Sequence, residues 1–139
     1  MVGTLATRQL SVAIERPPGE VYDFACVPEN FPKWAAGLGS SLTRGGDGWI
    51  AQTAHGPMRV RFTEKNSFGV LDHHVCPAEG DEIYIPVRVI ANGSGTEVVF
   101  TLFRQPGMSE AQFAQDAVLV EQDLRTLKEL IERRGPDGA

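Results

Sequence analysis

The stretch SEAQFAQDAVLVEQDLRTLKELIERRGP, residues 109–136, predicts one long amphipathic helix. Ser109 is a suitable N-cap, and Gln112 three residues later completes a capping box. Gly135 and Pro136 are expected to end the helix near Arg134. Apolar residues recur in steps of four and three on one continuous stripe: Phe113, Ala117, Val120, Leu124, Leu127 and Ile131. Such a stripe must be buried, so the rest of the chain has to supply an apolar face.

Seven earlier segments read as β-strands, several of them because apolar and polar residues alternate along them. Turn residues such as NGSG at 92–95 separate them. The segments are 8–15, 40–44, 48–54, 58–65, 69–75, 82–91 and 96–104. Between the first two, paired prolines at 17–18 end the strand, and Val21 with Phe24 gives a short helix one apolar edge. A second short helix follows, with Pro28 near its start. The economical arrangement is an α+β fold in which a curved antiparallel sheet of about seven strands grips the C-terminal helix.

This order of elements resembles the START-like, or SRPBCC, helix-grip superfamily, in particular its polyketide cyclase/dehydrase-like branch. The resemblance is carried by IERPPGEVYDFACVPENFPKWA at 14–35, which is similar to the opening strand and helix pair, and by the last strand and helix at 96–132. It implies an internal hydrophobic cavity between the sheet and the long helix. Because no linker, repeat or low-complexity segment interrupts the chain, we expect one domain over residues 1–139.

Composition argues against several classes of function. The formal net charge is -5 and the basic residues are dispersed, so no nucleic-acid partner is expected. No apolar run approaches the roughly 18 residues of a membrane span. The N-terminus does not resemble a secretory signal, and Cys26 and Cys76 are far apart, which favours reduced thiols in a cytoplasmic protein. No metal or cofactor motif is found, so neither is expected.

The run Asp72-His73-His74 raises the question of a catalytic or metal cluster. Counting outward from a tight turn at 66–67 puts His73 on the inner face of the sheet and its two neighbours on the outer face. Asp72 is then an exposed ion-pair partner of Arg61, and His74 is a surface residue. The expected inner pairs are Phe62 with Leu71, Val60 with His73 and Met58 with Val75, and the outer pairs are Arg61 with Asp72 and Arg59 with His74.

His73 has two interpretations: a core-edge histidine bonded to backbone or water, or the polar anchor for a ligand in an otherwise apolar pocket. Counting from the 92–95 turn adds the inner pairs Val89 with Val98, Val87 with Phe100 and Ile85 with Leu102. The candidate ligand-binding residues are His73, Trp34, Phe31, Met58, Val60, Phe62, Leu71, Ile85, Val87, Phe100, Phe113, Ala117 and Val120. The sequence does not decide whether the side chains of Trp49 and Thr53 lie on the inner or the outer face of the sheet.

Three functions fit these observations. The first is binding of a small hydrophobic or aromatic ligand in the internal cavity. The second is an enzyme of the polyketide cyclase or dehydratase type, with His73 as general base. The third is a protein-interaction module that uses the outer sheet face, including a homodimer through an exposed apolar cluster. The residues expected in that cluster are Tyr84, Ile90, Val99 and Phe103.

Overall fold

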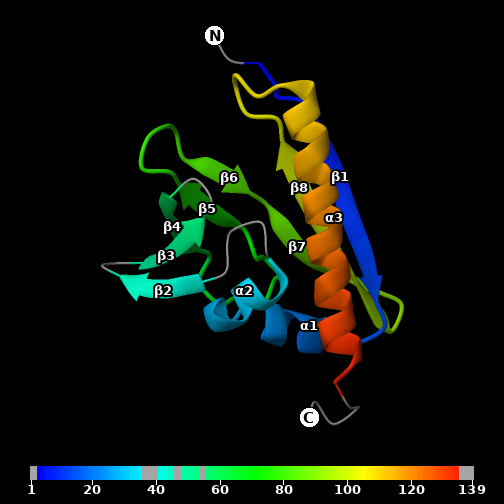
Figure 1. Cartoon of the computed structure of the whole chain (residues 1–139). Coiled ribbons are helices and arrows are strands. Elements are labelled where there is room, and N and C mark those ends of the chain that lie inside the picture. Colours follow the sequence, from blue (N-terminus) through cyan, green and yellow to red (C-terminus); the bar gives the residue numbers. More distant parts are fainter. Residues whose placement is uncertain (1–2, 36–40, 46–47, 54–55, 135–139) are drawn as a thin grey trace.

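The structure, a computed structural model, describes residues 3–35, 41–45, 48–53 and 56–134 (Figure 1). Its strands are β1 (Thr7–Ile14), β2 (Ser41–Gly45), β3 (Gly48–Thr53), β4 (Gly56–Phe62), β5 (His73–Cys76), β6 (Ile83–Ile85), β7 (Val87–Asn92) and β8 (Gly95–Phe103). Its helices are α1 (Pro18–Ala25), the 3-10 turn η1 (Pro28–Asn30), α2 (Phe31–Trp34) and α3 (Glu110–Glu132). Residues 40 and 54, at the ends of two expected strands, and the expected helix stop at 135–136 lie outside the described residues.

Helix α3 has the predicted apolar stripe, and all six residues of the stripe are buried. Its N-cap is Ser109, whose Oγ accepts a hydrogen bond from the backbone N–H of Gln112 at 3.1 Å. The second half of the expected capping box is replaced, because the Gln112 side chain donates to Asp116 at 2.8 Å. The helix lies along β1 and β8, with α1 and α2 near its C-terminal end (Figure 1). No helix in the described ranges is long and apolar enough to cross a bilayer.

The strands form two antiparallel sheets instead of the single sheet expected. One has the order β1-β8-β7 and the other the order β2-β3-β4-β5-β6. The expected strand 82–91 divides at Pro86, because proline has no N–H to donate to a ladder. The described residues therefore hold eight strands where seven were expected. Residues before Pro86 pair with β5, and residues after it pair with β8.

The register of the last hairpin is largely as predicted. Val89 pairs with Val98, and Val87 pairs with Phe100. The expected pair of Ile85 with Leu102 is wrong, because Ile85 precedes the break and pairs with His73 in the other sheet.

The segment before β5 joins the two sheets. The N–H of Leu71 donates to the carbonyl of Val87, and the N–H of Val89 donates to the carbonyl of Gly69, both at 2.8 Å. Gly69 has a φ of +71°, and a Cβ on it would lie 2.3 Å from the Val89 carbonyl oxygen. This approach therefore requires glycine at position 69.

The expected hairpin between β4 and β5 is out of register by two residues. The observed pairs are Phe62 with His73, Arg61 with His74, Val60 with Val75 and Arg59 with Cys76. The turn is a longer loop, organised by the side chain of Asn66, which bonds Glu64 O, Val70 O, Phe68 N and Val70 N at 2.9 to 3.1 Å. Since side chains alternate with a period of two, a slip of two residues leaves His73 on the inner face.

Asp72 is the residue most affected by this slip. It is 7% exposed, so the expected surface pair with Arg61 is wrong. Its carboxylate accepts hydrogen bonds from the Tyr84 hydroxyl at 2.8 Å, from the Val87 N–H at 2.9 Å, and from two nitrogens of Arg88 at 2.8 and 2.9 Å. Arg61 instead forms an exposed ion pair with Glu82 at 2.9 Å. The aspartate therefore holds together the ends of two sheets.

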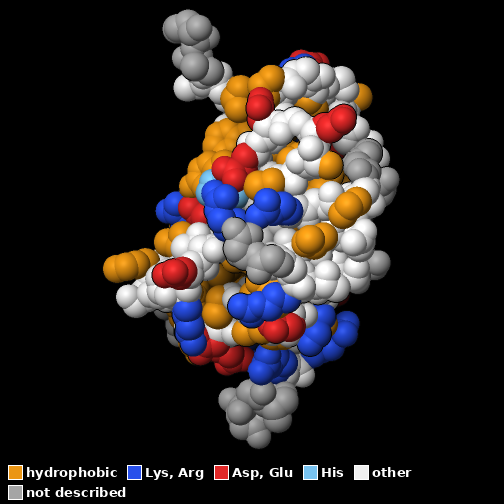
Figure 2. Space-filling view, turned by 90° about the vertical axis from the view of Figure 1, so that its left-hand side faces the viewer, with side chains coloured by type: hydrophobic (Ala, Val, Ile, Leu, Met, Phe, Trp, Pro, Cys, Tyr) orange, Lys and Arg blue, Asp and Glu red, His pale blue; other side chains and the backbone are white. Residues whose placement is uncertain are grey.

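Figure 2 shows one face of the molecule, on which acidic and basic side chains are interspersed with apolar ones. Basic residues form no continuous stripe on this face.

We predict that Asp72→Asn lowers the free energy of unfolding by about 2 to 4 kcal/mol, because it removes the charge from a buried site with four donors. Glu82→Gln is the matched control, since it weakens an exposed ion pair, and its effect should be small. Urea unfolding of the three proteins at neutral pH measures both. Equal midpoints for the two variants would contradict this account of the junction.

Candidate ligand-binding site

A cavity of about 20 Å³ lies between the short helices and the strands β4, β5 and β7. This volume is enough for about one water molecule. Its lining consists of Ala25, Cys26, Pro28, Phe31, Trp34, Phe62, Thr63, Leu71, His73 and Val87. None of these residues comes from α3, so the cavity differs from the one expected between the sheet and the long helix.

The structure brings together six of the candidate residues around this cavity: Phe31, Trp34, Phe62, Leu71, His73 and Val87. The other candidates lie elsewhere. Val60, Phe113, Ala117 and Val120 are buried, and Met58, Ile85 and Phe100 are half-buried. The guanidinium of Arg8 covers the ring of Phe113 at 5.5 Å from its centroid. Ala117 and Val120 belong to the main hydrophobic core.

Four lining residues were not expected: Ala25, Cys26, Pro28 and Thr63. Ala25 lies one helical turn after Val21, and both are buried on α1. The spacing could have predicted that Ala25 faces the interior, because residues four apart lie on the same face of a helix. Thr63 could not be found, since its position depends on the register slip.

The pairing of β3 with β4 determines on which face of the sheet the side chains of Trp49 and Thr53 lie. Trp49 is opposite Val60, which is 1% exposed, so both lie on the inner face. Thr53 has the same parity as Trp49, and its hydroxyl donates to the Gly56 carbonyl at 2.7 Å. The ring of Trp49 lies under the Arg44 guanidinium, 5.6 Å from the centroid.

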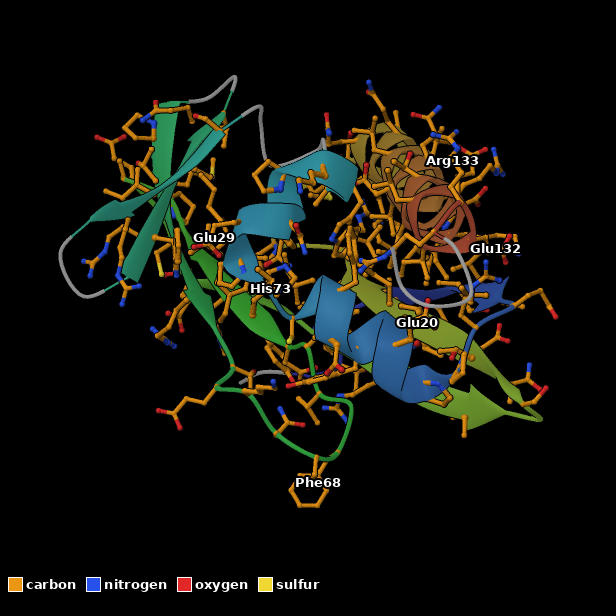
Figure 3. The ribbon with its side chains drawn as sticks, turned by 90° about the horizontal axis from the view of Figure 1, so that it is seen from below. Glu20, Glu29, Phe68, His73, Glu132 and Arg133 are labelled. Carbon is orange, nitrogen blue, oxygen red and sulfur yellow. The ribbon has the colours of Figure 1, made fainter. Side chains whose placement is uncertain are left out.

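Phe31 is the centre of an aromatic cluster beside the cavity. Its ring centroid lies 5.2 Å from each of the rings of Trp34, Phe62 and His73, all edge-to-face. The Phe62 ring also lies 5.8 Å from the His73 ring. Edge-to-face contacts of this kind are favourable. Figure 3 shows His73 in the interior, beside α2.

The protonation of His73 follows from its surroundings. It is 3% exposed, and burial lowers its pKa from 6.5 to about 4. The backbone bond to Leu71 and the nearby Asp72 carboxylate raise the pKa by smaller amounts. The ring is therefore neutral near pH 7. Its Nδ1 lies 3.1 Å from the Leu71 carbonyl oxygen, which only accepts, so Nδ1 carries the proton and Nε2 is a bare acceptor.

Trp34 contributes a donor to the same site. It is 4% exposed, and its indole Nε1 is buried with no hydrogen-bond partner among the described residues. His73 Nε2 likewise has no hydrogen-bond partner in the described part of the chain. The site thus pairs an apolar lining with one unused donor and one unused acceptor.

The three residues of the Asp-His-His run have different environments. His73 faces the cavity, and Asp72 joins the two sheets. His74 stacks on the Tyr84 ring at 5.0 Å between centroids, and Tyr84 stacks on Phe103 at 6.2 Å, on the outer face. The Asp72 carboxylate raises the pKa of Tyr84 through their hydrogen bond. Within the described ranges, no three His, Cys, Asp or Glu side chains are placed to hold a metal ion.

No family model matches the chain. No curated protein matches it either. Solved structures do match, at low sequence identity. One match is the crystal structure of Ara h 8.0201, whose sequence is 12% identical to this chain. The two structures superpose with a TM-score of 0.65, and the alignment covers 94% of this chain and 99% of the other. An uncharacterised protein from Bacillus thuringiensis is 15% identical with a TM-score of 0.71, covering 91% and 99%.

A third match is DynU16, a protein of the dynemicin biosynthetic locus, at 16% identity and a TM-score of 0.69. It covers 91% of this chain and 47% of that one. Identities this low bear on architecture alone. The described architecture, antiparallel sheets with a long C-terminal helix, is a helix-grip fold, as the resemblance to the START-like superfamily implied.

The buried His73 makes stability depend on pH. Its pKa is about 4 when folded and 6.5 when unfolded, so between these values only the unfolded chain binds the proton. The free energy of unfolding should therefore fall by about 3 kcal/mol as pH drops from 6.5 to 4. In His73→Phe this contribution is absent. Urea unfolding of both proteins across pH 4 to 8 measures the difference, and parallel curves would contradict a neutral buried His73.

Proposed function

We propose that the protein binds a small apolar or aromatic molecule at the cavity beside α2. The observation that supports this most directly is the composition of the site. Aromatic and aliphatic side chains surround a neutral histidine whose Nε2 is free to accept one hydrogen bond. Ligand sites are commonly apolar with a few placed polar groups.

Binding requires the site to widen, because about 20 Å³ is far less than the volume of an aromatic ring. The side chains that have to move are on α2, which spans only Phe31 to Trp34. Its N-cap, Asn30, makes no side-chain capping bond. The short length of α2 favours its displacement, although this displacement also uncovers the buried Phe31 and Trp34. We therefore assign the entry of the ligand to displacement of α2.

The alternative function is a cyclase or dehydratase with His73 as general base. DynU16, which comes from a biosynthetic locus, supports this alternative only through shared architecture. A pKa of about 4 makes His73 a weak base, because general bases work best with a pKa near the operating pH. The same pKa suits a neutral acceptor in a binding site. We rank binding first on this ground.

A homodimer through the outer face ranks below ligand binding. Tyr84 is 40% and Ile90 is 49% exposed, whereas Val99 and Phe103 are half-buried. Tyr84 is also engaged with Asp72 and with two rings. Sedimentation at micromolar concentration tests the dimer, and Ile90→Lys should abolish it. A single species of 15.1 kDa for the unmodified protein would remove this proposal.

We also infer a cytoplasmic location, which is supported by the two cysteines being free.

The two cysteines provide a test of ligand binding. Cys26 lines the cavity, whereas Cys76 lies outside it with Glu82 3.2 Å from its sulfur. Burial raises the pKa of both thiols, so labelling with N-ethylmaleimide is best measured near pH 8.5. In the single-cysteine variants Cys76→Ser and Cys26→Ser, p-xylene or p-cresol should slow labelling of Cys26 several-fold. Labelling of Cys76 should not change.

Labelling of Cys26 that stays equally fast at millimolar concentrations of both compounds would count against a ligand site at this cavity. Equal slowing of both cysteines would instead indicate a general effect on the protein.

A further inference from the structure

We propose that the ligand carries a hydroxyl group, whose oxygen accepts a hydrogen bond from Trp34 Nε1–H and whose proton is donated to His73 Nε2. This inference rests on the proposed binding function and specifies the class of ligand: a neutral phenol, enol or alcohol on an apolar frame.

The donor is the first part of the argument. The Nε1 atom of Trp34 is buried and has no partner among the described residues. Buried donors without partners are rare in proteins, because they lose their bonds to water and gain nothing. Trp34 is also 4% exposed, so bulk water does not solvate it. A group that accepts a hydrogen bond at this position would remove the penalty.

The acceptor is the second part. The Nδ1–H of His73 is used by the Leu71 carbonyl oxygen at 3.1 Å, which fixes the tautomer and leaves Nε2 able only to accept. Both Trp34 and His73 line the cavity, and their rings are both centred 5.2 Å from the Phe31 ring. A ligand that displaces Phe31 would therefore contact both the Trp34 ring and the His73 ring.

The chemical class follows from satisfying both atoms with one group. A hydrocarbon satisfies neither, and an ether or ketone oxygen accepts from Trp34 but leaves Nε2 bare. A carboxylate has no proton to donate near pH 7, and no Lys or Arg is among the lining residues to balance its charge. A hydroxyl donates and accepts at once. The apolar part of the ligand faces Phe62, Leu71 and Val87.

The test compares three probes of similar shape: p-cresol, 4-methylanisole and p-xylene, titrated calorimetrically into the full-length protein. In a purely apolar cavity p-xylene binds best, because the hydroxyl of p-cresol loses its bonds to water. We expect the reverse order here, with p-cresol at least fivefold tighter than p-xylene and 4-methylanisole between them. In Trp34→Phe and in His73→Phe, the ratio of the p-cresol affinity to the p-xylene affinity should fall toward one, whatever the change in p-xylene binding itself.

The outcomes separate this inference from the function on which it rests. If p-xylene binds as well as p-cresol to the unmodified protein, the hydroxyl preference is wrong and the apolar binding site stands. The same result is expected if a trapped water already bridges Trp34 and His73. If none of the three compounds binds at millimolar concentration, both proposals are wrong. The comparison in the unmodified protein decides the matter even if a variant fails to fold.

Discussion

The four hydrogen bonds to the Asp72 carboxylate are the interaction on which the rest of the structure depends. The chain breaks its strand at Pro86, so the continuous strand that would have run through both sheets is lost at that point. Asp72 replaces it by binding Tyr84 before the break and Val87 and Arg88 after it. Burial alone would raise the pKa of Asp72, but these bonds outweigh burial and lower it. The carboxylate therefore stays charged at neutral pH, when it accepts the most hydrogen bonds.

The position of His73 is a consequence of this junction. Adjacent strand residues point to opposite faces, so fixing Asp72 against the outer residues Tyr84 and Arg88 directs His73 to the inside. There it meets Phe31 and Phe62, and burial makes it neutral. The charge of one residue and the neutrality of the next thus have a common structural origin. A histidine that is neutral and held by its Nδ1 suits recognition of a donor better than transfer of a proton.

The sequence predicted those features that depend on local periodicity. The stripe on α3 and the inward facing of His73 follow from repeats of 3.6 and 2 residues. Features that depend on a single side chain acting at a distance were not predictable. Asn66 forms hydrogen bonds with four neighbouring backbone groups and so stabilises a turn longer than the one expected. Because the longer turn changes the register between β4 and β5, the contacts of Asp72 could not be predicted. The location of the cavity was missed for a related reason: which apolar side chains fill the interior and which leave a gap is decided by packing.

The separation of the cavity from α3 has a consequence for how such a protein could diversify. The apolar stripe that organises the core lies along α3, and the cavity is lined by α1, η1, α2 and strands beyond the helix. Four lining residues, Ala25, Phe31, Trp34 and Val87, belong to the same buried core as that stripe, so substitutions there would disturb the packing as well as the site. Lining positions outside that core, such as Pro28 and Thr63, can change what is recognised while the long helix stays packed.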